Sequence, residues 1–275
     1  SRAIGDKRIM STATRLLDVL GLFTFDTPEW TAEAVARELN LSLSTAYRYF
    51  RHLSDAGLIV AYAPGRYVVG PAITQLDRQT RLRDPLISIA RPLMRQALEE
   101  LSPGAVLLLC RLYRDQVMCV HQETRTPHPI AISYERGKLM PLYRGAASKV
   151  ILAYLPARQV QRHYRISGGM EGALGSDWKE VKRALRKLRS AGIAITHAEL
   201  DPGMVGVAAP LFGPDGNVVG SLGLVLPESA GENGVSDAAV NVVKSYAADI
   251  NAVFRQAYGY EARPRGIPED DQTLS

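Results

Sequence analysis

The sequence is poor in cysteine and has neither a long apolar run nor a low-complexity tract. Its two cysteines, Cys110 and Cys119, lie in strand-like surroundings rather than in the close pairs of metal and redox motifs. We therefore expect reduced thiols, no metal site and no cofactor. No apolar run approaches the ~20 residues of a membrane helix, and the first residues lack the basic-then-apolar order of a signal peptide. These absences predict a cytoplasmic protein without a membrane partner.

Positive charge exceeds negative charge only slightly. The 33 Lys and Arg residues against 28 Asp and Glu residues give a net charge of +5, which permits nucleic-acid binding but does not require it. The length favours two domains of about 100 to 200 residues, each able to bury its own core. The positions of the basic residues therefore matter more than their total.

The first 70 residues predict three short helices and a β-hairpin. Apolar residues recur at helical spacing over 8–23, and a second helix follows Thr31, which can cap it. Ser42 can cap a third helix, for which Gly57 provides a left-handed stop. Two β-prone runs with a turn between them follow. This order of elements is typical of a winged helix-turn-helix.

The third helix, residues 42–56, has two different faces. The apolar face contains Ala46, Tyr49, Phe50 and Leu53 and needs a partner. The other face presents hydroxyl groups and arginines, which can contact phosphates or base edges in a major groove. The expected DNA contacts are Ser42, Ser44, Thr45, Tyr47, Arg48 and Arg51, together with Arg66 of the hairpin. For the arginines alone, a merely solvated helix face is the alternative.

The rest of the chain mixes helices and strands. A linker helix is expected over 71–83, followed by an amphipathic helix with Ile89, Leu93, Leu98 and Leu101 inward. Two strand pairs should turn at 114–115 and 214–216, and helices are expected near 145–155 and 176–191. A last helix should run from Ser236 towards Tyr258, and its inward residues are Val240, Val243, Ile250, Val253 and Phe254. The helix near 176–191 has one strongly basic face. Because its other face is apolar, a solvated face is favoured there over a second nucleic-acid surface. The segment 260–275 has almost no apolar residues and is expected to be flexible.

An enzyme is the rival interpretation, in which the second domain processes a small molecule and the first serves as an interaction module. Cys110, Cys119, His121, His197 and Glu199 are nucleophile or base types. Cys119 and His121 are two residues apart on a predicted strand and should share a face, but no nucleophile motif flanks them. The segment 196–199 has no metal-ligand partner at a recognised spacing. We expect no catalytic residue.

Four segments, in the right order along nearly the whole chain, resemble the IclR-type family of bacterial transcriptional regulators. "LSLSTAYRYFRHLSDAGLI" is similar to the family's recognition helix, with Ser44 and Thr45 ahead of Arg48. "GRYVVGPAITQL" resembles the last strand of the wing and the linker helix. "MPLYRGAASKVILAYLP" and "ELDPGMVGVAAPLFGPDGNVVGSLGLVLP" resemble the two signature segments of the effector-binding domain.

The resemblance implies a DNA-binding winged helix and a C-terminal GAF-like domain that binds a small metabolite. Family members form dimers through the N-terminal part and tetramers through the effector domains, and many act on genes for the catabolism of aromatic or small organic acids. Dimerisation also has a physical reason, because one short recognition helix reads few base pairs and a twofold pair reads a near-palindrome.

In the family, effectors lie between the sheet and the loop before the helix "GAASKVILA". The matching positions are Ala146 and Ala147 in the loop and Thr196, Met204, Gly206, Gly223 and Val225 in the sheet. Members that bind small polar acids can carry an acid, a thiol or serines at four of the sheet positions. Their absence here implies a less polar, roomier cavity for a larger acid, such as an aromatic one, held by the loop amides or Arg144. An exposed loop charge is the alternative for Arg144.

The prediction is therefore an α+β two-domain protein. It comprises a winged helix-turn-helix DNA-binding domain over 1–70, a linker helix over 71–84, a GAF-like mixed α/β effector-binding and oligomerisation domain over 85–259, and a flexible tail over 260–275. The expected function is a ligand-responsive regulator, not an enzyme, that binds a near-palindromic double-stranded DNA operator as a homodimer or homotetramer. A small organic acid in the second domain is expected to change its DNA affinity or geometry. Repression that the acid relieves and activation that the acid promotes would require the same residues.

Overall fold

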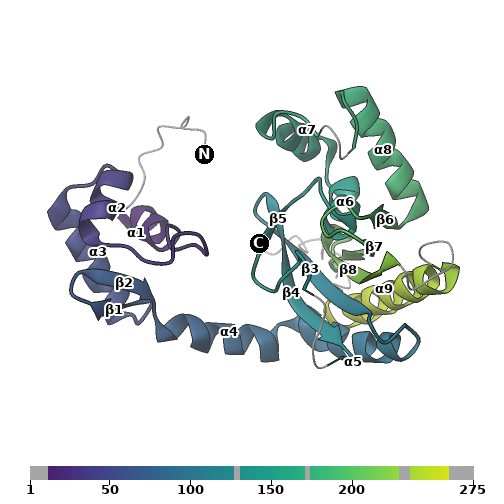
Figure 1. Ribbon diagram of the computed structural model, residues 1–275, viewed down its shortest axis with the longest axis horizontal. Coiled ribbons are helices and arrows are strands. Elements are labelled where there is room, and N and C mark those ends of the chain that lie inside the picture. The colour runs from purple at the N-terminus through teal and green to yellow at the C-terminus, as the bar shows by residue number, and fades with distance from the viewer. Residues whose placement is uncertain (1–11, 127–130, 171–173, 229–235, 260–275) are drawn as a thin grey trace, which may run out of the picture. The chain divides into compact units, whose positions relative to one another are not determined.

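The computed structural model describes residues 12–126, 131–170, 174–228 and 236–259 (Figure 1). The chain divides between Arg83 and Asp84 into two compact units. The expected flexible tail over 260–275 lies outside the described residues. None of the helices in the described ranges is long and apolar enough to cross a membrane.

The first unit contains the expected helices and hairpin. Its described elements are α1 (Thr12–Leu20), α2 (Ala32–Glu38), α3 (Leu43–Asp55), β1 (Ile59–Ala63), β2 (Arg66–Val69) and α4 (Pro71–Arg83). The Thr31 hydroxyl accepts a hydrogen bond from the Ala34 amide, and the Ser42 hydroxyl accepts one from the Thr45 amide. Gly57 has a φ of 68°, a left-handed conformation that costs glycine little. Both predicted caps and the predicted stop are confirmed.

A small core holds α3 against α2 and the hairpin. The four apolar residues predicted for the buried face of α3, Ala46, Tyr49, Phe50 and Leu53, are all buried. The ring of Phe50 meets the edge of Tyr67 on β2, with ring centroids 4.8 Å apart. Tyr67 also exchanges two backbone hydrogen bonds with Trp30. These contacts fix the hairpin beside α3, so the opposite face of α3 is left to solvent.

The second unit is a six-stranded sheet between helices. Its described elements are α5 (Pro85–Glu99), β3 (Val106–Tyr113), β4 (Gln116–Thr124), β5 (Leu139–Pro141), α6 (Ala146–Tyr154), α7 (Ala157–Ile166), α8 (Trp178–Ala191), β6 (Ala194–His197), β7 (Met204–Phe212), β8 (Val218–Pro227) and α9 (Asp237–Tyr258). The strand order is β5-β4-β3-β8-β7-β6, and all neighbours are antiparallel.

Both faces of this sheet are covered (Figure 1). On one face, α5 and α9 pack over Leu107 and Leu109 of β3. On the other, α6 packs over Leu108 and Cys110 of the same strand, and α8 packs against α6. Because alternate residues enter two different cores, β3 is an almost continuous apolar run rather than an alternating one.

Two elements of this unit, α7 and β5, were not predicted from the sequence, and β6 was expected only as a sheet position at Thr196 through the family resemblance. In α7, Val160 and His163 are the buried residues, which is too sparse an apolar pattern to stand out. The two strands span three and four residues and give almost no periodicity.

The predicted inward faces of α5 and α9 pack on the core, with one exception. In α9, Val253 is 42% exposed, whereas Ala239 and Ala247 are buried. In α5, Ile89 and Leu93 are half-buried at the edge of the packed face, whose centre contains Ala90, Met94 and Ala97. The other residues predicted to face inward are buried in this core or packed against it, so the prediction is wrong only for Val253, and it left out the alanines at the centre of both buried stripes.

Candidate functional sites

The first candidate site is the exposed face of α3. Its N-terminal end carries three hydroxyl groups close together, because the Ser42 hydroxyl lies 2.8 Å from that of Thr45 and 3.1 Å from that of Ser44. Ser42 also caps the helix. The amides of the first helical turn and these hydroxyls together form a donor-rich end that favours a phosphate.

Carboxylates contact three of the predicted DNA-binding side chains, namely Tyr47, Arg51 and Arg66. The Tyr47 hydroxyl donates to Glu33 of α2, and this hydrogen bond lowers the pKa of Glu33 and raises that of Tyr47. Arg51 lies 3.8 Å from Asp55, one turn further along α3. Glu33 comes from a neighbouring helix and Asp55 is the last residue of α3, so neither acid belongs to the central turns of the exposed face.

The hairpin arginine is also paired. Arg66 lies 2.8 Å from the carboxylate of Glu29, which the Tyr62 hydroxyl also contacts. By contrast, Arg48 is exposed and has no carboxylate partner among the residues that the structure describes, and its guanidinium lies 5.8 Å from the centre of the Tyr49 ring. Arg48 is thus the arginine of this surface that is most available to a base or a phosphate.

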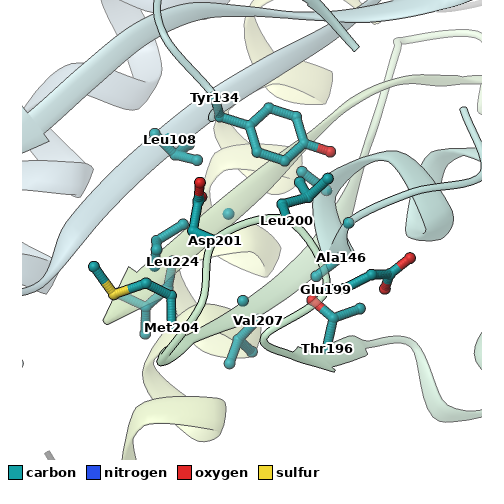
Figure 2. A pocket seen from close by; sticks show the side chains of 15 residues that line it. Leu108, Tyr134, Ala146, Thr196, Glu199, Leu200, Asp201, Met204, Val207 and Leu224 are labelled. Atoms are coloured by element: carbon teal, nitrogen blue, oxygen red, sulfur yellow. The ribbon is translucent and has the colours of Figure 1, made fainter. Parts of the chain in front are cut away.

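The second candidate site is a pocket between the start of α6 and the strands β3, β6, β7 and β8 (Figure 2). Seven of the eight predicted effector residues line it, namely Ala146, Ala147, Thr196, Met204, Gly206, Gly223 and Val225. The exception is Arg144, which lies outside the lining and whose Nη2 donates a hydrogen bond to the Glu199 carbonyl.

Glycines let α6 approach the sheet closely. A Cβ on Gly206 would lie 2.9 Å from the Thr196 hydroxyl oxygen and 3.4 Å from the Cβ of Ala146. Gly145, which precedes α6 with a φ of 79°, has the Leu200 side chain and the Tyr134 hydroxyl against the position of its missing Cβ. A larger residue at Gly206 would push the start of α6 away from the sheet, and one at Gly145 would displace Leu200 and Tyr134.

The start of α6 has amide donors that the helix itself does not use. Gly145, the N-cap residue, has no side chain to cap the helix. The Ser148 amide donates to the Tyr134 hydroxyl over 3.2 Å, and burial raises the pKa of that phenol, which stays neutral. The amides of Ala146 and Ala147 come before Ser148 and have no partner within the helix. They line the pocket, where a carboxylate would accept their hydrogen bonds.

Two carboxylates also line the pocket, and the sequence did not predict either of them as a site residue. The Glu199 carboxylate accepts a hydrogen bond of 2.7 Å from Lys149, so its charge is matched. The Asp201 carboxylate accepts hydrogen bonds from the Ser133 amide and hydroxyl. Figure 2 shows the Asp201 carboxylate directed towards Leu108 and Tyr134.

The lining residues that were not predicted fall into two groups. Glu199, Leu200 and Asp201 belong to the signature segment beginning "ELDPG", so the sequence held the signal for them. Tyr134 comes from the chain before β5, where no pattern pointed to it. Its contact with Ser148 at the start of α6 depends on the tertiary fold.

The cavity is mostly apolar but small. Leu108, Leu200, Met204, Val207 and Leu224 supply apolar lining side chains. The volume that water can occupy is about 30 Å³, which is room for a few water molecules at most. The expectation of a roomy cavity is therefore wrong for this conformation, because the start of α6 lies close against the small residues at the sheet positions, with Ala146 beside Gly206 and Ala147 beside Gly223.

The cysteine and histidine that suggested an enzyme do not meet. The Cα partner of Cys119 is Cys110, but that of His121 is Leu109, because the register shifts at this point. This β-bulge turns the two side chains to opposite faces of the sheet, and the His121 ring bonds Glu123 on the α5 side. The prediction that Cys119 and His121 share a face is wrong.

Models of known families match most of the chain. The model described as bacterial transcriptional regulator IclR C-terminal matches residues 80–252, and that of the IclR helix-turn-helix domain matches residues 12–61. The chain is 25% identical to the HTH-type transcriptional regulator BhcR of Paracoccus denitrificans, over 84% of each chain. It is 19% identical to the regulator KipR of Bacillus subtilis, over 78% of this chain and 84% of that protein.

Solved structures share the fold. An IclR transcriptional regulator from Alicyclobacillus acidocaldarius has a TM-score of 0.72 at 23% identity, covering 90% of this chain and 100% of that one. An IclR homologue from Microbacterium hydrocarbonoxydans, complexed with 4-hydroxybenzoate, has a TM-score of 0.69 at 19% identity with the same coverage. The predicted arrangement of a helix-turn-helix domain and a mixed α/β domain is confirmed.

Proposed function

Because this chain belongs to the IclR family of bacterial transcriptional regulators, with a DNA-binding domain and a C-terminal effector domain, we propose that it binds a near-palindromic operator as a homo-oligomer and responds to a small organic acid. The acid occupies the pocket at the start of α6. Its binding changes the affinity of the protein for the operator, or the spacing of the recognition helices on it.

The observation that carries the DNA-binding part is the free Arg48 on the exposed face of α3. A capped helix end with hydroxyl groups positions the helix on phosphates, and an arginine one turn further reaches base edges. Arg66 lies on the hairpin beside this face, where a basic residue contacts the backbone or the minor groove.

Exposed apolar residues support an oligomer. No residue of α4 is buried within the first unit, and Leu76 and Leu82 of this helix are 51% and 48% exposed. Leu17 on α1 is 63% exposed. Leucines exposed on two helices favour contact with a second copy of the chain, which a near-palindromic operator also requires.

The pocket supports an acid with a polar group at its other end. The carboxylate of the ligand accepts hydrogen bonds from the amides of Ala146 and Ala147, while Asp201 accepts one from a ligand hydroxyl. A hydroxylated aromatic acid has both groups, and the homologue from Microbacterium hydrocarbonoxydans was crystallised with such an acid.

Entry of an acid of this size requires the cavity to open. The covering segment, residues 198–203, begins at Ala198 and ends at Gly203, which have φ angles of 47° and 70°. Left-handed residues at both ends of a short surface segment make it a candidate hinge. Its three carboxylate hydrogen bonds to Ser133 hold it closed in this structure.

Selection of DNA by the protein tests the proposed function. The full-length protein is incubated with a pool of random duplexes, and the retained sequences are determined over several rounds. We expect a near-palindromic consensus whose half-sites are one helical turn apart or a multiple of it. Retention of unrelated sequences without a common motif would contradict the proposal.

Replacement of Arg66 by alanine is expected to weaken binding to the selected operator and to unrelated DNA by about the same factor. A backbone contact carries no sequence information, so the slope of log K against log salt concentration should also become less steep by about 1. Fluorescence anisotropy at several salt concentrations measures both effects. A loss confined to the operator would contradict the backbone role.

A further inference from the structure

Helices α7 and α8 form a strongly basic part of the second unit. They are neighbours, since the rings of Tyr164 and Trp178 lie 5.3 Å apart (Figure 1). Together they carry nine Lys and Arg residues and one acid, Glu180. Their excess of positive charge is larger than the net charge of +5 of the whole chain, so the remainder of the sequence is acidic on balance.

Some of these basic side chains have structural partners. Arg162 pairs with Asp115 in the turn between β3 and β4, and Arg189 donates to the carbonyls of Ala153 and Leu155. The other seven are exposed and have no carboxylate within ion-pair distance among the described residues, and one of them, Arg186, donates to the Lys182 carbonyl. The remaining six are called the basic surface, and they are Arg158, Arg165, Lys179, Lys182, Arg183 and Lys187.

The basic surface differs from an ordinary solvated helix face. Exposed helices usually alternate acids and bases at i,i+4 spacing. In α8, by contrast, Lys179, Arg183 and Lys187 follow one another at that spacing with like charge, which destabilises the helix, and the one acid of α8, Glu180, interacts electrostatically with Arg183. The buried side chains Val181 and Leu185 lie on the other side of this helix. A polyanion against the basic surface would remove this repulsion.

We propose that the basic surface contacts the phosphate backbone of the DNA that flanks the operator. The row of three charges on α8 spans about 12 Å, along which a duplex presents roughly seven phosphate charges. The inference rests on the proposed function, because DNA held by α3 is then tethered near the same molecule. Tethering raises the effective concentration of flanking DNA, so that weak phosphate contacts add measurably to affinity.

The test compares short and long duplexes with a charge-neutralised protein. The operator selected by the protein is placed in a duplex that just covers it and in one extended by about 20 base pairs on each side, or two helical turns. The variant Arg165→Gln, Arg183→Gln, Lys187→Gln removes three charges. It should bind the short duplex like the wild type but lose the extra affinity for the long one, with a salt slope less steep by about 2 to 3.

Two controls separate the contact from general effects. The charge-preserving variant Arg165→Lys, Arg183→Lys, Lys187→Arg should keep the wild-type preference for the long duplex. So should Lys138→Gln, Lys244→Gln, Arg255→Gln, which removes three exposed charges elsewhere in the same unit. Equal melting temperatures for all variants show that folding is unchanged.

The possible outcomes separate a failure of this inference from a failure of the proposed function. If the neutralised variant keeps the wild-type length dependence and salt slope, the basic surface does not contact DNA and the inference is overturned. If the wild type itself prefers neither the selected operator nor any other sequence, the proposed function fails, and the inference with it.

Discussion

Replacing Gly223 with phenylalanine is expected to abolish the response to the effector while leaving ligand-free DNA binding intact. Gly223 lies on β8, and a Cβ there would be 3.5 Å from the Cβ of Leu108 and 3.6 Å from that of Ala147. A Cβ therefore fits, but the ring beyond it would enter the cavity beside the start of α6. The closed cavity has no spare volume for a ring, and in the opened cavity the phenylalanine ring would take the space that the acid needs, so the acid would be excluded.

Thermal denaturation in the presence of organic acids measures this loss. An acid at 100 times its dissociation constant stabilises the folded wild type by about 2.7 kcal/mol, and this increment should disappear in Gly223→Phe. The matched control is Gly223→Ala, whose methyl group makes ordinary contacts and should keep most of the response. Normal stabilisation of the phenylalanine variant would show that the acid binds elsewhere.

Replacing Arg48 with alanine is expected to weaken binding to the selected operator by about 1–3 kcal/mol, a factor of roughly 5 to 150. The reason is that Arg48 has no carboxylate partner among the described residues and projects from the exposed face of α3. If it forms a bidentate contact with a guanine, the loss should concern the operator far more than unrelated DNA.

Two companion variants assign the role of Arg48 more closely. Arg48→Lys keeps the charge but not the fork of donors, so it should retain non-specific binding and lose specificity. Arg51→Ala removes an arginine already near Asp55 and should have the smaller effect. Operator affinity unchanged in Arg48→Ala would exclude a base contact by this residue.

The sequence predicted the DNA-binding unit well because its signals are local. A cap at Ser42, a left-handed stop at Gly57 and the apolar residues of α3 lie within 16 positions of one another. Each acts on the backbone nearby, so the sequence shows both the helix and its buried face. The carboxylates of Glu29 and Glu33, by contrast, reach Arg66 and Tyr47 only through the tertiary fold.

The pocket was predicted only in part, since its walls come from distant segments. Matching to the family motifs located Ala146 and Ala147, which were expected in a loop and are the first residues of α6, and the sheet positions opposite them. The family assignment itself is confirmed. The inward position of Tyr134 and the outward turn of Arg144 depend on contacts with Ser148 and Glu199. Cys119 and His121 point to opposite faces of the sheet because β4 contains one extra residue, a β-bulge. The pattern of residue types in this segment does not reveal such a bulge.

The most direct test of coupled acid and DNA binding is the operator affinity of the full-length protein with and without a bound acid. Acids such as benzoate and 4-hydroxybenzoate are first screened for one that raises the melting temperature. Operator binding is then measured by fluorescence anisotropy at a saturating concentration of that acid. We expect the dissociation constant to change by a factor of about 5 to 150 in either direction. An unchanged constant at saturation would contradict the coupling on which the proposed function depends.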